Sequence, residues 1–215
     1  MKNCSEVTEF ILLGIPHTEG LETLLFVLFL PFYACTLLGN MSILVTVLSS
    51  NSLHTPMYFF LGNLSVFDMS FSSVTCPKML LYLMGLSPRI SYKDCVSQLF
   101  FFHFLGSIDC FLYTVMAYDR FTAICHPLRY AVIMSPRVCV ALAVGTWLLG
   151  CVHSSVLTLL TFTPPYCGPN EVAHFFCDIP ALLPLACADT SLYETLMYIC
   201  CVLMLLIPIS FISTS

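Results

Sequence analysis

The chain is 215 residues long, and 59% of its residues are hydrophobic whereas only 9% are charged, which gives a mean hydropathy of +0.93. A soluble domain keeps about a quarter of its residues charged, so this composition excludes a soluble domain and indicates a membrane protein. The net charge is −5 and no basic run occurs, which argues against a nucleic-acid partner.

Five apolar segments are long enough to cross a membrane, since about 20 apolar residues span the hydrocarbon core. In chain order they cover residues 24–48, 57–83, 95–121, 138–162 and 192–215. We therefore expect an all-α membrane protein in contact with lipid. A tail over 1–23 precedes the first segment, and a long loop over 163–191 separates the fourth from the fifth.

The orientation follows from the tail and the long loop, which lie on the same side of the membrane. Outside Lys78, which lies within the second segment, Lys and Arg are divided three and three between the two sides, so the positive-inside rule does not decide. Asn3 in "NCS" is an acceptor for N-glycosylation in the secretory lumen, and the cysteines of the loop need an oxidising compartment to form disulfides. Both features place the N-terminus outside the cell.

Three cysteines follow one another at intervals of ten residues in the long loop: Cys167, Cys177 and Cys187. Cys95, at the outer start of the third segment, completes an even set, and four cysteines allow three pairings. A bridge to the third segment would fold the loop over the bundle as a lid. A zinc site of His174 with the three loop cysteines is a competing interpretation, but it lacks the close paired spacing that is usual for structural zinc.

Two carboxylates stand in the middle of apolar segments, Asp68 in the second and Asp109 in the third. A charge at the bilayer centre costs about 2.5–3.5 kcal/mol on insertion scales, so both residues should face the interior of the bundle. There they can share a proton, hold a small cation, or be neutral and hydrogen-bonded. The residues alone leave these alternatives open.

Asp119 and Arg120 lie at the inner end of the third segment. They can form a local pair that ends the helix at the membrane boundary. Alternatively they form a switch, in which Arg120 exchanges Asp119 for another partner when the helices move. Both interpretations fit the residues.

One semi-polar face runs along the outer half of the third segment, with positions at i, i+4, i+7 and i+11: His103, Ser107, Cys110 and Thr114. Phenylalanines flank His103, so the face predicts a small-ligand pocket that is mostly apolar with a few polar groups. His153 and Ser154 in the fourth segment can face the same pocket.

Four stretches together indicate a known family: "GN" at 39–40, "LHTPMYFFLGNLSVFD" at 53–68, "MAYDRFTAICHPLRY" at 116–130, and the three-cysteine loop. With them the chain resembles the olfactory receptors, a branch of the rhodopsin-like G-protein-coupled receptors. The resemblance implies a rhodopsin-like transmembrane helix bundle in the plasma membrane. It also implies a small volatile odorant as ligand and a stimulatory heterotrimeric G protein that raises cAMP.

The resemblance further implies roles for individual residues. It pairs Cys95 with Cys177 and Cys167 with Cys187, and it suggests a sodium ion or a shared proton at Asp68 and Asp109. It makes Arg120, next to Asp119, the switch that meets the G protein. The contacting inner loop then contains His126, Pro127 and Leu128. The implied odorant contacts are Phe102, His103, Gly106, Ser107, Cys110, His153, Ser154, Cys200, Cys201 and Met204.

Two departures from the family pattern matter. The usual Asp-Arg-Tyr is Asp119-Arg120-Phe121 here, which removes a hydroxyl. The sequence also ends at Ser215, where the family continues with spans six and seven, so we expect five of seven helices, in a partial or pseudogene product that cannot signal alone.

Other classes of membrane protein fit less well. A transporter or channel could use Asp68 and Asp109 as an ion path, but inverted repeats and matched helix-breaking Gly and Pro positions are missing from the sequence. An enzyme is not expected, because the sequence contains neither G-x-S-x-G nor H-E-x-x-H.

Overall fold

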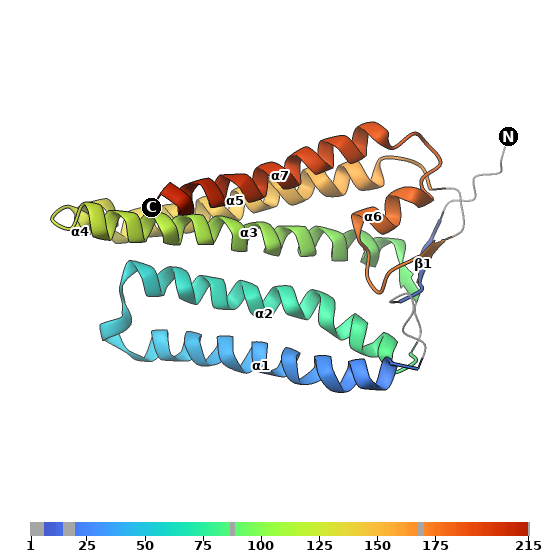
Figure 1. Cartoon of the computed structure of the whole chain (residues 1–215), viewed down its shortest axis with the longest axis horizontal. Helices are drawn as coiled ribbons and strands as arrows, with labels where there is room; N and C mark the ends of the chain where they lie inside the picture. The colour runs from blue at the N-terminus through green and yellow to red at the C-terminus, as the bar shows by residue number, and fades with distance from the viewer. Residues whose placement is uncertain (1–6, 15–19, 87–88, 167–169, 215) are drawn as a thin grey trace.

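The computed structural model describes residues 7–14, 20–86, 89–166 and 170–214, the side chains of 207–208 and 211–214 excepted. Long helices make up most of this part of the chain and lie side by side as a bundle (Figure 1). They are α1 (Glu22–Ser49), α2 (Pro56–Leu83), α3 (Tyr92–Cys125), α5 (Pro136–Phe162) and α7 (Ser191–Thr214). The predicted rhodopsin-like helix bundle is confirmed.

Shorter elements connect and cover the long helices. The short helices are η1 (Asn51–Leu53), α4 (Tyr130–Ile133), α6 (Ile179–Leu182) and η2 (Leu183–Leu185). The strands are β1 (Glu9–Leu12), β2 (Arg89–Ser91) and β3 (Glu171–Val172).

The starts of the long helices follow from local sequence. Pro56 and Pro136 occupy the first turns of α2 and α5, where the missing N–H costs nothing. Ser91 caps α3, because its hydroxyl oxygen accepts a hydrogen bond from the Asp94 backbone N–H at 3.1 Å.

α3 is the central helix, and it packs against α2, α5 and α7, whereas α1 contacts the bundle through α2 (Figure 1). Val47 is the only buried residue of α1, and most of its apolar side chains are exposed outside the partly buried face toward α2, as expected of a helix in lipid. By length and composition α1, α3 and α5 could each cross a membrane. α2 is as long as α1, but Asn63, Asp68 and Lys78 make it more polar.

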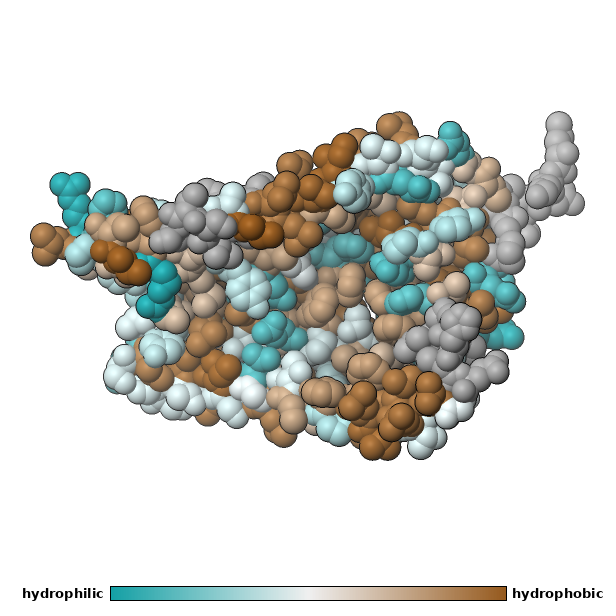
Figure 2. Space-filling view, in the orientation of Figure 1, coloured by the Kyte–Doolittle hydropathy of each residue, from teal (hydrophilic) through white to brown (hydrophobic). Residues whose placement is uncertain are grey.

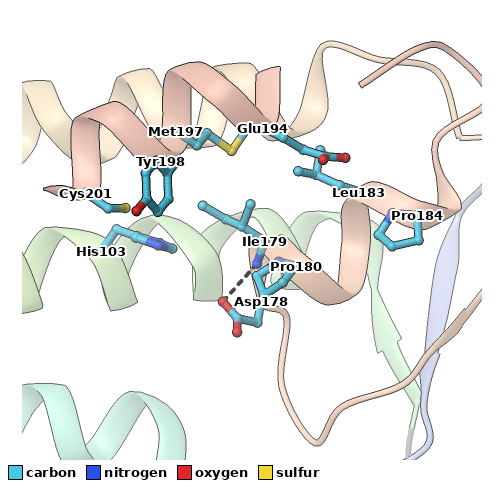
Figure 3. Close-up of a pocket in the computed structure, with 10 residues that line it drawn as sticks. All are labelled: His103, Asp178, Ile179, Pro180, Leu183, Pro184, Glu194, Met197, Tyr198 and Cys201. Carbon is cyan, nitrogen blue, oxygen red and sulfur yellow. Dashed lines mark hydrogen bonds between the residues drawn. The ribbon is translucent and has the colours of Figure 1, made fainter. Parts of the chain in front are cut away.

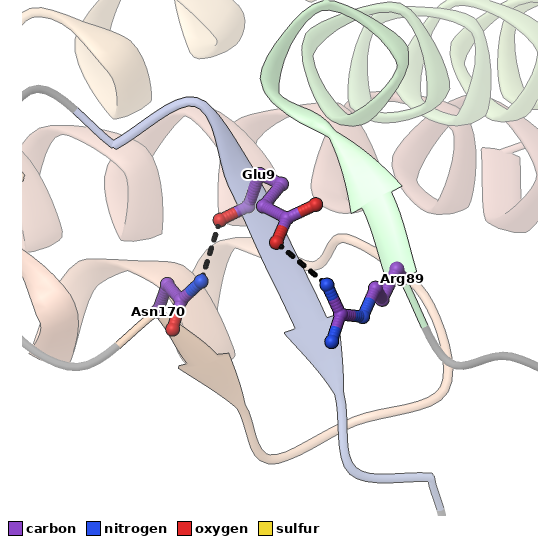
Figure 4. A network of polar contacts seen from close by, with 3 residues as sticks. All are labelled: Glu9, Arg89 and Asn170. Carbon is purple, nitrogen blue, oxygen red and sulfur yellow. Dashed lines mark hydrogen bonds and ion pairs between the residues drawn. The ribbon is translucent and has the colours of Figure 1, made fainter.

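A small sheet at one end of the bundle was not expected from the sequence. Its strand order is β2-β1-β3; β1 pairs antiparallel with β2 and parallel with β3. Figure 4 shows the polar contacts of Glu9, whose carboxylate binds Arg89 at 3.1 Å and whose backbone carbonyl accepts from the Asn170 side-chain N–H at 3.0 Å. The sheet therefore joins the N-terminal tail to the loop before α3 and to the lid, which is residues 163–191.

The buried apolar side chains form two clusters along the bundle. The outer cluster lies under the sheet and the lid and includes Phe10, Cys95 and Leu182. The inner cluster lies between α2, α3 and α5 and includes Phe60 and Ile108. Outside these clusters the long surfaces are hydrophobic, as along the outer edge of α7 in Figure 2, while hydrophilic side chains are frequent at both ends of the bundle.

Candidate functional site

The lid is fixed to α3 by a disulfide between Cys95 and Cys177, with an S–S distance of 2.01 Å. Both cysteines are fully buried. Next to the bridge, the Cys177 backbone N–H donates to Oε1 of Gln98 at 3.1 Å, and Nε2 of Gln98 donates to the Val74 carbonyl at 3.3 Å. The predicted bridge between α3 and the lid is confirmed.

The competing zinc site is not formed. The sulfur of Cys177 is in the disulfide, and no cluster of three potential ligands for a metal occurs within residues 7–14, 20–86, 89–166 and 170–214. His174 instead stacks on the ring of Phe175, with the ring centres 4.5 Å apart. His174 is therefore a packing residue of the lid.

Two predictions involve residues outside the described ranges, namely Asn3 and Cys167. Cys187 is exposed and has no bridge to a described cysteine. Its backbone N–H donates to the Pro165 carbonyl at 2.9 Å, so the two ends of the lid lie next to each other. The Cys167–Cys187 bridge and the glycosylation of Asn3 stay predictions.

The middle of the lid turns into the short helix α6, for a local reason. Asp178 is the N-cap, because its Oδ1 accepts from the Ile179 backbone N–H at 2.9 Å, and Pro180 follows in the first turn. On the bundle side of the cap, Phe176 packs against Phe102 of α3, with the ring centres 5.0 Å apart. The lid thus lies directly against the outer half of α3.

A cavity of about 590 Å³ lies between α3, the lid and α7 (Figure 3). This volume is typical of a small-molecule site. Lid residues and residues of α7 provide most of its lining, and α3 adds one residue: His103, Asp178, Ile179, Pro180, Leu183, Pro184, Glu194, Met197, Tyr198 and Cys201.

His103 and Cys201 are the predicted ligand contacts that line this cavity. Nδ1 of His103 lies 2.9 Å from the Leu99 carbonyl oxygen. A carbonyl can only accept, so Nδ1 holds the hydrogen and the neutral ring keeps Nε2 as an acceptor.

Several of the other predicted contacts join α3 to α5. The Ser107 hydroxyl lies 2.8 Å from Nδ1 of His153, and the fully buried Ser154 donates to the Phe100 carbonyl at 2.5 Å. Gly106 lies against Phe71 of α2. Cys110, Cys200 and Met204 are half-buried. As ligand contacts these residues stay predictions.

Sequence reasoning missed the acidic side of the cavity, Asp178 and Glu194. The available signal was local, since "CDIP" places an N-cap residue immediately before a helix start that contains proline. It predicts a helix inside the lid, but not where that helix sits on the bundle.

Asp68 and Asp109 belong to α2 and α3, which pack together, and the negative charge of Asp68 acts on Asp109. Oδ1 of Asp109 is buried and has no hydrogen-bond partner among the described atoms. A bound cation and a proton shared between the two carboxylates would each satisfy this oxygen.

At the opposite end of α3, Asp119 is 1% exposed and accepts a hydrogen bond from the Tyr130 hydroxyl at 2.7 Å. The local pair of Asp119 with Arg120 is not formed, so that prediction is wrong for this conformation; in the described ranges the one ion pair joins Arg89 to Glu9. The reason is helix geometry, because neighbouring side chains point about 100° apart, which sends Asp119 inward and leaves Arg120 exposed. Burial raises the pKa of Tyr130 to about 12, and the hydrogen bond to Asp119 contributes.

The loop between α3 and α4 exposes His126, Pro127 and Leu128. Leu128 is 99% exposed, and Ile124 and Val132 beside it in the sequence are 74% and 78% exposed. Exposed apolar side chains at such a density are typical of interaction surfaces.

A helical bundle with a disulfide-fixed lid over a ligand-sized cavity is the architecture of a rhodopsin-like, multi-pass membrane receptor. The family model described as "Olfactory receptor" matches residues 29–214, and the chain belongs to the olfactory receptor family.

Similar proteins include olfactory receptor 10D3 of Homo sapiens, 86% identical over 194 residues, and olfactory receptor 10D3 of Mus musculus, 85% identical over 194 residues. Each match covers 90% of this chain and 62% of the relative. Olfactory receptor 10D1B of Mus musculus is 64% identical over all 215 residues, which cover 69% of it. The chain thus spans less than two thirds of the two 10D3 relatives.

Proposed function

We propose that the chain forms the greater part of an odorant receptor, in which a small odorant binds the cavity under the lid and a heterotrimeric G protein binds the opposite end of α3. The strongest support is the cavity between α3, α7 and the lid, in a chain of the olfactory receptor family. The disulfide Cys95–Cys177 links this lid to α3. The activated G protein is of the stimulatory type and raises cAMP.

α3 links the two ends in this proposal, because it contains His103 at the cavity and Asp119 and Arg120 at the other end. An odorant that binds one helix arrangement better than another shifts the population toward that arrangement. Arg120 is exposed, and together with the apolar side chains around Leu128 it supplies a charged and apolar surface for the G protein. In this proposal the lid and the sheet lie on the extracellular side of the membrane. The loop between α3 and α4 lies on the cytoplasmic side.

We also propose that Asp68 and Asp109 hold a sodium ion in the resting receptor. The support is the unpartnered buried Oδ1 of Asp109 and the nearby negative charge of Asp68. Carboxylate oxygens are suitable ligands for a hard cation, which would offset their mutual repulsion.

The experiment uses the chain joined to the part of human olfactory receptor 10D3 that it does not match, which we call the extended receptor. It is expressed at the cell surface and exposed to an odorant panel while cAMP is measured. We expect at least one odorant to raise cAMP in a saturable way. Silence toward all odorants, with the receptor at the surface, would contradict the proposal.

Arg120→Ala separates coupling from binding in the same assay. We expect the cAMP response to disappear while odorant binding is retained, because Arg120 lies at the far end of α3 from the cavity. Arg137→Ala is the matched control, since Arg137 is also exposed near this end, at the start of α5. An unchanged cAMP response in Arg120→Ala would remove its role as the switch.

A further inference from the structure

The cavity wall is rich in hydrogen-bond acceptors and negative charge. Two carboxylates, Asp178 and Glu194, line it, and no Lys or Arg is among its described lining residues. His103 adds an acceptor, since Nδ1 donates to the Leu99 carbonyl and leaves Nε2 free to accept. Only the Tyr198 hydroxyl and the Cys201 thiol offer donors from side chains, so a ligand that brings donors fits best.

The carboxylates of Asp178 and Glu194 can each accept further hydrogen bonds. Asp178 accepts one backbone N–H through Oδ1, and Glu194 accepts the Thr190 hydroxyl through Oε1 at 2.7 Å. A carboxylate offers about four acceptor positions. Neither forms an ion pair within the described ranges, where Arg89 and Glu9 make the one pair.

The positions of the two carboxylates differ. Asp178 is half-buried at the start of α6 and lies below Ile179 in Figure 3, whereas Glu194 is exposed in the first turn of α7. The negative charge of Asp178 acts on both His103 and Cys201, which line the cavity from α3 and α7. Asp178 is therefore the less exposed of the two charges that line the cavity, and Glu194 is the more exposed.

We propose that this cavity selects small primary aliphatic amines, bound as ammonium ions at Asp178; the inference rests on the proposed odorant-receptor function. An aliphatic amine, like the lysine side chain, has a pKa of about 10.4 and is charged at neutral pH. Its N–H groups form charge-assisted hydrogen bonds with the carboxylate, and its carbon chain lies against Ile179, Leu183 and Met197. An ionised carboxylic acid is repelled by the negative charges of Asp178 and Glu194. An aldehyde can only accept hydrogen bonds, and most polar groups that line the cavity can only accept them too.

The test compares hexylamine, hexanol, hexanal and hexanoic acid, which share one carbon skeleton, on the extended receptor. We expect hexylamine to be at least about tenfold more potent than hexanal and hexanoic acid, because only it makes a charge-assisted hydrogen bond to Asp178. Hexanol, a neutral donor, should fall between them. Equal or greater potency of hexanal or hexanoic acid, or no response to hexylamine while other odorants act, would overturn the inference.

Asp178→Asn removes the charge and preserves the helix cap, since Asn caps as well as Asp. We expect the potency of hexylamine to fall about tenfold or more, while that of hexanol changes less. Asp189→Asn is the matched control, because Asp189 is in the same lid, binds Ser191 and does not line the cavity. Unchanged hexylamine potency in Asp178→Asn would contradict the ammonium site.

A binding measurement keeps this inference separate from the signalling proposal. The thermal stability of the purified chain should rise with hexylamine and not with hexanoic acid, and Asp178→Asn should abolish the rise. If no odorant of any class raises cAMP, the odorant-receptor proposal fails, and this measurement still decides the amine site. No rise with hexylamine overturns the site even where other odorants signal.

Discussion

Tyr130 holds Asp119 through a hydrogen bond of 2.7 Å that satisfies a carboxylate buried to 1% exposure. Tyr130→Phe removes the donor and leaves the buried oxygen unpaired, so we expect the free energy of unfolding to fall by about 1–3 kcal/mol. The check is thermal unfolding of the purified variant. Tyr118→Phe is the control, since Tyr118 is 40% exposed on α3, next to Asp119 in the sequence; an equal loss in both variants would contradict the specific role of Tyr130.

The hydrogen bond between Tyr130 and Asp119 also predicts that the stability of the folded chain depends on pH in the alkaline range. Burial raises the pKa of Tyr130 from 10.0 to about 12 in the folded chain, so the native state keeps this proton to a higher pH than the unfolded state does. The stabilisation is therefore fully present below about pH 10 and is lost as the pH rises toward 12. We expect the stability gap between the wild type and Tyr130→Phe to close over this window; a gap that stays constant would exclude the linkage.

Asp109 allows a test of the sodium proposal at a single side chain. Sodium should raise the thermal stability of the wild type by mass action when it replaces a larger cation at constant ionic strength. Asp109→Asn should lose this dependence, while Asp189→Asn, with the same charge change at an exposed position, should retain it. A wild type that does not respond to sodium would favour the proton shared with Asp68.

Residue types alone predicted part of the candidate site. His103 could be placed at the cavity because its spacing on a long helix fixes its face. Asp178 could not, because its position depends on how the lid folds back onto α3, and a loop sequence has no periodicity from which to read that path. The partner of Asp119 was missed for a related reason, since Tyr130 reaches it from a separate short helix.

The contact between α3 and α5 depends on Gly150. A Cβ atom there would lie 2.9 Å from Cγ1 of Ile108 and 3.3 Å from the Phe104 carbonyl oxygen. We expect Gly150→Ala to separate the two helices and to cost about 1–3 kcal/mol, measured by thermal unfolding. Gly145→Ala, on the same helix with nothing within 4 Å, should be neutral or stabilising by up to about 1 kcal/mol. Equal effects of the two substitutions would contradict the close approach.

The disulfide between α3 and the lid joins residues 82 positions apart. Cys95→Ser should cost about 2–4 kcal/mol and sharply reduce the surface expression of the extended receptor, because the lid loses its tie to α3. The control is Cys151→Ser, since Cys151 is free and exposed on α5. Normal surface expression of Cys95→Ser would show that the lid is held without the bridge.

The long helices were predictable as elements, and the sheet was not. Each long helix corresponds to an apolar segment of the sequence, and proline or serine sets the start of α2, α3, α5 and α7, whereas α1 begins after Leu21 without a side-chain cap. The strands are two to four residues long and come from three distant segments, so their pairing is decided by tertiary contacts such as the burial of Phe10. Within the described part of the N-terminal tail, Phe10 and Leu12 therefore belong to the outer cluster.

At the scale of the whole molecule, the composition and the blocks of apolar residues were sufficient to predict a membrane helix bundle. The composition could not predict that a single helix links the two ends of the bundle. α3 contacts the cavity and the lid at one end and the exposed inner loop at the other. A receptor needs such an element, since two binding sites influence each other only through a conformational equilibrium that both of them bias.

The most direct test of the proposed receptor measures this coupling in both directions. The affinity of the extended receptor for an active odorant is determined with and without the purified G protein, and the affinity for the G protein with and without the odorant. Linkage requires the same factor in both directions, and we expect about 5–150-fold. Odorant binding whose affinity is identical with and without bound G protein would contradict the account.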